Sequence, residues 1–268
     1  MRVKDLSAQT ELLDSDVLLV DNGTNGTKKI LVSNFIANNA GAHNSVYRGK
    51  SLGGSVTADQ WAEIKAGTFR GLYIGDYWTI NSIDWIIAHF DKSYGLGDTA
   101  FNTHHITVIP RTTLYYAQMN TTDTSSGGYY NSAMKQTNLA QALTTAKTAF
   151  GEAHIATHRV LLDNAPNGGT VTGWAWYDSQ IDLMTEEEVY GCQEWGNNTG
   201  NSAYCSGINY GRLALFTLAP QMACNRGWYW LRTVDGSTSF CVVDDNGYAG
   251  YSSASGSGGV RPRLELIG

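Results

Sequence analysis

The C-terminal end of the chain carries the feature that most constrains its fold. Two bulky segments, Trp228-Tyr229-Trp230-Leu231-Arg232 and Gly259-Val260-Arg261-Pro262, enclose the tract 233–258. This tract lacks Lys, Arg, Glu, Gln, Met, Trp and Pro, and consists mainly of Ser, Gly, Asp, Ala, Thr, Val and Tyr. Such residues make adaptable recognition surfaces, in which Tyr supplies contact area. A flexible Gly/Ser linker has a similar composition, but the rigid flanks favour a recognition surface.

The overall composition excludes several classes of function. The chain has 268 residues, a net charge of -6 and 16% charged residues, against about 25% in an average soluble protein. Its Lys and Arg residues form no basic run, so we expect no nucleic-acid partner. No apolar run is long enough to span a bilayer, so we expect no membrane insertion. The N-terminus lacks the pattern of a signal peptide, which predicts synthesis in a cytoplasm.

The pattern divides the chain into residues 1–40 and a domain over 45–268. Segments 16–20 and 29–32 are short apolar strands, separated by two Asn-Gly turn signals. A single hairpin is too small to fold alone, so we expect it to pack on the main domain, on sister subunits or on a larger assembly. Residues 33–44 are polar and rich in Ala and Asn, which is typical of a connector.

The main domain is predicted to be α+β, with two main helices, short strands and long loops. Capping boxes begin at Thr57 and Thr185, and apolar spacing predicts a helix over 138–150. Strands are expected at 72–80, 83–88 and 105–110, and then near 214–217, 229–232, 240–243 and 260–264. The loops 120–134 and 191–211 are long for a compact domain, which indicates function or packing by their own side chains.

We expect no metal, no cofactor and no catalytic residue. The four Cys residues lack the spacing of a metal site, and both free thiols and a disulfide remain open. His154 and His158 are spaced i, i+4, but the remaining features of a zinc-protease motif are missing. The run Glu186-Glu187-Glu188 suits a helix start and its macrodipole better than a glycosidase pair. Neither motif of calcium-dependent lectins is present.

Several motifs resemble a family of phage and gut-metagenome structural proteins: Asp76-Tyr77-Trp78, the segment 84–91 and the two C-terminal flanks. The resemblance covers about residues 45–268 and implies a C-type-lectin-like fold of the formylglycine-generating-enzyme branch. The same region is similar to the variable proteins of diversity-generating retroelements, in which the stretch between these flanks binds the ligand. Residues 1–36 resemble the N-terminal modules of phage tail fibres.

The resemblance implies a receptor-binding protein at the virion tail, with a host-surface protein or glycan and other tail proteins as partners. Two alternatives remain: an enzyme of the formylglycine-generating or carbohydrate-active kind, for which Cys224 and Cys241 are the candidate thiol pair, or a purely structural virion protein. Cys241 lies in an apolar run and is predicted to be a buried, inert thiol.

Side-chain size and strand alternation predict which residues form the receptor surface. Trp228, Trp230, Phe240 and Val242 should point inward, and Gly247 should turn the chain so that 248–255 return across the same face. The expected ligand-binding residues are Tyr229, Asp235, Ser237, Ser239, Tyr248, Tyr251, Ser252, Ser253 and Ser255.

The N-terminal hairpin generates a prediction about assembly. Tail fibres that resemble this segment are commonly trimers, so the full chain should be a homotrimer. A truncated chain that starts at residue 45 should be monomeric, because it lacks the hairpin. Light scattering on both proteins measures this. If both are monomers, the N-terminal segment is a docking peptide for another protein instead.

Overall fold

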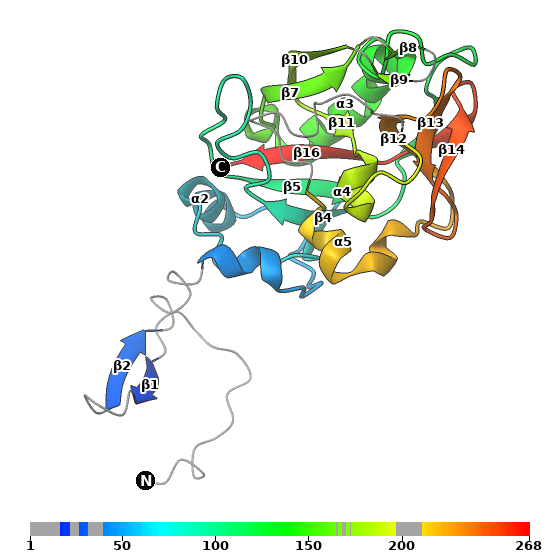
Figure 1. Cartoon of the computed structure of the whole chain (residues 1–268). Helices are drawn as coiled ribbons and strands as arrows, with labels where there is room; N and C mark the ends of the chain where they lie inside the picture. Colours follow the sequence, from blue (N-terminus) through cyan, green and yellow to red (C-terminus); the bar gives the residue numbers. More distant parts are fainter. Residues whose placement is uncertain are drawn as a thin grey trace.

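The computed structural model describes residues 17–21, 27–31, 40–164, 166–167, 170–171, 173–196 and 211–268. These residues form a mixed helix and sheet structure of the α+β class, as the sequence predicts (Figure 1). The helical segments are η2 (Ala40–Ser45), α2 (Ala58–Ala66), η3 (Met134–Asn138), α3 (Leu139–Phe150), η4 (Glu152–His154), α4 (Glu186–Tyr190), α5 (Ala214–Leu218) and η6 (Pro220–Ala223). The strands are β1 (Val17–Asp21), β2 (Thr27–Leu31), β3 (Tyr77–Ile80), β4 (Ile83–Phe90), β5 (His105–Pro110), β6 (Tyr115–Gln118), β7 (His158–Asp163), β8 (Pro166–Asn167), β9 (Thr170–Val171), β10 (Trp174–Ser179), β11 (Asp182–Leu183), β12 (Tyr229–Val234), β13 (Ser239–Val243), β14 (Ala249–Ser253), β15 (Ser257–Val260) and β16 (Pro262–Ile267).

Two five-stranded sheets organise the main part of the molecule. One has the order β11-β16-β5-β4-β3, and the other has the order β14-β13-β12-β15-β6. The C-terminal strand β16 runs through the middle of the molecule, whereas β13 and β14 lie at its periphery (Figure 1). The second sheet therefore presents the tract between the two bulky flanks at the side of the fold.

The predicted N-terminal hairpin forms. β1 and β2 pair antiparallel, with Val17 opposite Leu31 and Asp21 opposite Thr27. Their turn lies outside the described residues. The division into 1–40 and 45–268 stays a prediction.

Local helix signals in the sequence are confirmed. Thr57 and Thr185 each complete a capping box, and Gly67 and Gly191 end their helices in the left-handed conformation. The predicted helix over 138–150 corresponds to α3, which buries Leu139, Ala142, Ala146 and Phe150. Leu143, predicted on the same buried face, is half-buried. Within the described parts of the chain, no helix combines the length and the apolar character needed to cross a bilayer.

Two strand predictions were wrong. The predicted strand 72–80 is reduced to β3, because buried Asp76 accepts hydrogen bonds from the Arg48 side chain and from the backbone N–H of Lys50 and Tyr73. These bonds fold 73–76 into a turn. The segment 214–217 is the helix α5 instead of a strand. Its first N–H donates to Nδ1 of His89 at 3.0 Å, and a short apolar run does not distinguish a buried strand from a buried helix.

A buried ionic network lies between the first sheet and α4. Arg263 on β16 contacts Glu188 on α4 at 3.0 Å and Glu265 on its own strand at 2.6 Å. Glu265 also accepts a hydrogen bond from the Thr107 hydroxyl on β5 at 2.6 Å. Burial alone would raise the pKa of both carboxyl groups, but neighbouring cations outweigh it. The pKa of Glu188 is lowered, mainly by Arg263, and that of Glu265 is lowered to about 2 by His105, Arg263 and His158.

Two histidines near this network are neutral above about pH 4, so His158 carries positive charge only in the acidic range in which Glu265 titrates. Burial lowers the pKa of His89 and of His158 to about 4. His89 accepts a backbone N–H through Nδ1, which requires that nitrogen to be unprotonated. His158 stacks on Phe101 with ring centroids 5.3 Å apart, and neither of its ring nitrogens has a hydrogen-bond partner among the described residues.

These histidines predict a loss of stability in acid. The unfolded chain binds protons at His89 and His158 below pH 6.5, whereas the folded chain binds them only near pH 4. Stability should therefore fall as the pH drops from 6.5 to 4, by up to about 3 kcal/mol for each histidine. Buried Asp163 opposes this in part, because its pKa is raised to about 6 and protonation favours the folded state there.

The test compares His158→Phe with His104→Gln, in which a half-buried surface histidine is replaced. The free energy of unfolding, measured with urea between pH 6.5 and 4, should depend less steeply on pH in His158→Phe than in the wild type. His104→Gln should keep the wild-type slope. Equal slopes in wild type and His158→Phe would contradict the assignment.

Candidate ligand-binding surface

The two flanks of the C-terminal tract lie side by side in the structure. β12, from the first flank, pairs in parallel with β15, with Tyr229 opposite Gly259. The Gly259 N–H donates to the Trp228 carbonyl at 3.1 Å. A Cβ atom at Gly258 would lie 2.3 Å from the Trp228 ring, so only glycine permits this approach. The tract 233–258 is therefore a loop whose ends are fixed against each other.

Arg261 joins the flanks through Tyr229. The Arg261 guanidinium is fully buried, lies 5.1 Å from the centre of the Tyr229 ring and donates to its hydroxyl at 3.2 Å. It also donates to the carbonyls of Pro110 and Met222. The Tyr229 hydroxyl in turn donates to the Ala223 carbonyl in η6. This contact fixes the tract's ends within the core.

The prediction that Tyr229 faces the ligand was wrong, because Tyr229 is completely buried. Alternation along β12 does separate it from Trp230, but the outer face of the strand is covered by η6 and Arg261. Trp230 is fully buried as predicted, while Trp228 is half-buried and meets it edge to face at 5.0 Å. Both faces of β12 therefore belong to the core.

The tract itself folds as a hairpin of β13 and β14. Cys241 pairs with Tyr251, and Ser239 pairs with Ser253. β13 is buried along its whole length, which confirms the inward placement of Phe240 and Val242. Among the remaining predicted site residues, those that are exposed are Ser237, Tyr248, Tyr251 and Ser253; those that are half-buried are Asp235, Ser252 and Ser255; and Ser239 is buried.

Several polar side chains that were predicted to contact the ligand instead form hydrogen bonds within the protein. The Ser239 hydroxyl donates to Asp235 at 2.6 Å across the turn between β12 and β13. The backbone N–H and the hydroxyl of Ser255 both donate to Asp123, which lowers the pKa of that carboxyl. Ser125, from the same long loop, donates to the Gly236 carbonyl. The loop 120–134 is therefore hydrogen-bonded to the tract. The Ser239 and Ser255 hydroxyls stabilise the fold.

Two of the predicted site residues, Tyr248 and Tyr251, are exposed aromatic side chains, and exposed Trp195, which was not predicted, lies beside Tyr251. Tyr248 is 71% exposed, Tyr251 55% and Trp195 49%. The Trp195 and Tyr251 rings are 5.0 Å apart, tilted by 57°. The Trp195 indole N–H donates to the Ala249 carbonyl at 3.2 Å. We call Trp195, Tyr248 and Tyr251 the aromatic surface.

Glu186 places Trp195 on this surface. Its buried carboxylate accepts the backbone N–H groups of Trp195 and Gly196 at 2.9 and 2.8 Å. The Glu186 N–H donates to the Thr233 hydroxyl on β12. A Cβ atom at Gly196 would lie 2.6 Å from the Thr233 side chain. The sequence signal for this role is the glutamate run itself, which by position alone predicts only an interaction with the helix macrodipole.

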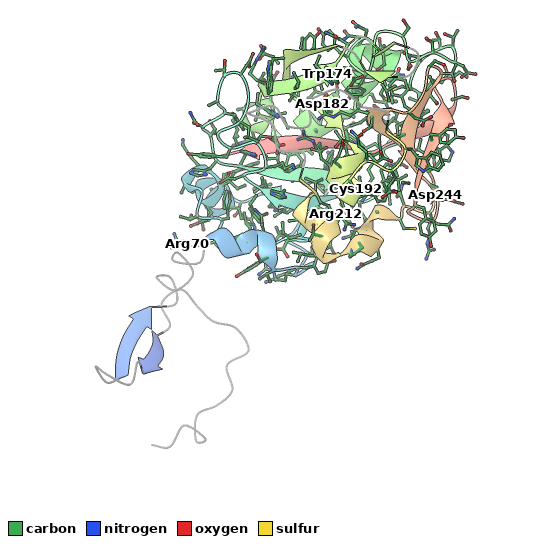
Figure 2. The ribbon with its side chains drawn as sticks, in the orientation of Figure 1. Arg70, Trp174, Asp182, Cys192, Arg212 and Asp244 are labelled. Carbon is green, nitrogen blue, oxygen red and sulfur yellow. The ribbon has the colours of Figure 1, made fainter. Side chains whose placement is uncertain are left out.

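Acidic residues neighbour the aromatic surface in the sequence. Asp244 and Asp245 lie in the turn between β13 and β14, directly before Tyr248, and exposed Glu194 precedes Trp195. Figure 2 shows Asp244 on the side of the molecule where β13 and β14 lie, and Cys192 near α4. The tract 233–258 contributes no Lys or Arg. The surface is therefore aromatic and negatively charged.

The cysteines near the tract are free thiols. Cys241 is buried on β13 of this hairpin, and burial, together with nearby Glu186, raises its pKa above the ordinary value. Its burial was predicted. Cys192 and Cys224 are exposed and free, and Cys205 lies outside the described residues. In the described part of the chain, no three His, Cys, Asp or Glu side chains gather in a way that could hold a metal ion.

The chain was compared with models of known protein families, with curated proteins and with solved structures, and none of them matches it.

The role of Glu186 generates a prediction. Glu186→Gln keeps the shape of the side chain but replaces one acceptor oxygen by an amide donor, which leaves the partly buried N–H of Trp195 or Gly196 without its acceptor. We expect a loss of about 1–3 kcal/mol in unfolding free energy, together with a change in Trp195 fluorescence. Glu194→Gln, an exposed change in the same segment, should stay within about 0.5 kcal/mol. Equal stability of the two variants would show that Glu186 does not hold the segment.

Proposed function

We propose that this chain is a receptor-binding protein of a phage tail, a non-enzymatic module on a C-type-lectin-like scaffold that binds a host-surface ligand. The observation that carries the proposal is the exposure of Tyr248 and Tyr251 on a hairpin whose two ends are fixed in the core, together with exposed Trp195, which packs against Tyr251 from the segment after α4. A binding surface needs large, rigid side chains at little entropic cost, and aromatic residues on a rigid scaffold supply them.

The distribution of exposure within the tract supports this role. The exposed positions Ser237, Tyr248, Tyr251 and Ser253 make no side-chain hydrogen bond within the described residues, whereas the buried positions Ser239 and Cys241 contact Asp235 and Glu186. The outward side chains can therefore change without breaking contacts of the core. Such tolerance suits a surface that must follow a changing receptor, as in the variable proteins of diversity-generating retroelements.

The fold offers further support for the lectin-like assignment. The resemblance rests in part on the two C-terminal flanks, and these flanks are paired strands that enclose a surface hairpin. The virion location, the tail partners and the absence of enzymatic activity rest on the resemblance. Sequencing the DNA downstream of the gene tests the retroelement association: a reverse transcriptase and a near-copy of the 3′ end support it.

Adsorption to host cells tests the receptor role. Virions that carry the double change Tyr248→Ala and Tyr251→Ala should bind their host at least about tenfold more weakly, since aromatic hot spots contribute 1–2 kcal/mol or more each. The matched control is Tyr116→Ala on β6, at the opposite edge of the same sheet, where the tyrosine is 58% exposed. Unchanged adsorption by the double variant would refute the proposal.

A further inference from the structure

The hydrogen-bond register of β14 determines which of its backbone N–H and C=O groups point away from β13. The Asp244 N–H donates to the Tyr248 carbonyl at 2.8 Å. Hydrogen-bonded pairs recur at every second residue of an antiparallel ladder. The backbone groups of even-numbered residues in β14 therefore face β13, and those of Ala249, Tyr251 and Ser253 face outward. The bond from the Trp195 indole to the Ala249 carbonyl agrees with this direction.

Among the residues that the structure describes, most of these outward groups have no partner. The Ala249 carbonyl accepts from Trp195, and the Ser253 carbonyl accepts from the Gly256 N–H. Within the described parts of the chain, nothing bonds the N–H groups of Ala249 and Ser253 or either backbone group of Tyr251. β14 is also the last strand in the order of its sheet.

The edge strand β3 of the other large sheet is covered by backbone pairing. Along β3, Tyr77 and Thr79 donate to the carbonyls of Lys50 and Gly53, and the Tyr77 carbonyl accepts the Leu52 N–H. Edge strands are usually blunted by Lys, Pro, a bulge or a covering segment. β14, with the sequence Ala-Gly-Tyr-Ser-Ser, has neither Lys nor Pro, and its pairing with β13 shows no register shift.

The spacing of these groups matches an extended chain. Alternate residues of a strand lie about 7 Å apart, so the edge offers donors and acceptors at the repeat of a polypeptide backbone. Trp195 and Tyr251 pack together over the first half of β14 and would contact alternate side chains of an added strand. Glu194, Asp244 and Asp245 supply negative charge nearby, which favours a basic segment.

We propose that β14 binds an extended, positively charged peptide segment of the receptor, which adds to the sheet as a sixth strand. This inference rests on the proposed function and names its ligand class as protein rather than glycan. Main-chain bonds to the edge would supply affinity, and the Trp195–Tyr251 pair would supply selectivity, as in other cases of strand addition.

The probe is the peptide acetyl-Lys-Val-Thr-Lys-Val-Thr-Lys-amide, titrated into the full chain by calorimetry. A second peptide, N-methylated at every other amide, has the same side chains but cannot pair along one edge. The first peptide should bind and should slow hydrogen–deuterium exchange in segment 248–256. The N-methylated peptide and lactose should do neither. Absence of binding by the first peptide would overturn the proposal.

Proline substitutions on the strand give matched variants. Ser253→Pro removes an outward N–H, which an edge strand tolerates, and should weaken peptide binding about five- to tenfold relative to Ser253→Ala. Ser252→Pro removes an N–H that faces β13 and should instead lower the melting temperature. If Ser253→Pro binds the peptide as Ser253→Ala does, the edge is not the site. If Ser253→Pro does not fold, exchange protection in the wild-type chain decides.

Two further outcomes separate this proposal from others. Concentration-dependent dimers with the same exchange protection, formed without peptide, would assign the edge to a second copy of this chain and overturn the proposal. If peptide binding fails while the Tyr248→Ala and Tyr251→Ala virions lose adsorption, the receptor role stands and the strand-addition mode is wrong. If adsorption is also unchanged, the receptor role itself fails.

Discussion

The contact of Arg263 with Glu188 and Glu265 is the interaction on which the rest of the structure depends. It joins the C-terminal strand to α4 in a region where all three side chains are almost completely buried. Removing one member of a buried ion pair leaves an uncompensated charge, which typically costs about 3–5 kcal/mol. Because the Thr107 hydroxyl on β5 donates a hydrogen bond to Glu265, this network also fixes β16 against β5. The central strand and the helix are therefore locked in one arrangement.

Three consecutive glutamates of the short helix α4 connect this buried network to the surface. Glu188 forms an ion pair with Arg263, and Glu187 accepts a hydrogen bond from Gln193. Glu186 accepts hydrogen bonds from the backbone N–H groups of Trp195 and Gly196. The orientation of Trp195 against β14 thus follows from how α4 is seated on β16. A surface residue placed in this way loses little conformational entropy when a ligand binds, which is the advantage of preorganisation.

Local signals made much of the fold predictable, and long-range burial accounts for the errors. The capping boxes at Thr57 and Thr185 and the spacing in 138–150 involve residues within a few positions of each other, so sequence alone identifies them. Tyr229 was misplaced because the cover over it comes from η6 and Arg261, which local alternation does not reveal. Trp195 was missed for the same reason, since its partner Glu186 acts through backbone bonds. The exposed Tyr248 and Tyr251 were found because turn chemistry at Gly247 determines them locally.

The same division between local and long-range contacts explains how a stable fold can present a changeable surface. The ends of the tract are fixed by Arg261, Tyr229 and the close approach of Gly258 to Trp228, all outside or at the limit of 233–258. Within the tract, the hairpin is held largely by backbone pairing of β13 with β14, which does not depend on the outward side chains. Substitution at Tyr251 or Ser253 therefore changes what the surface contacts while the hydrogen bonds that shape it remain.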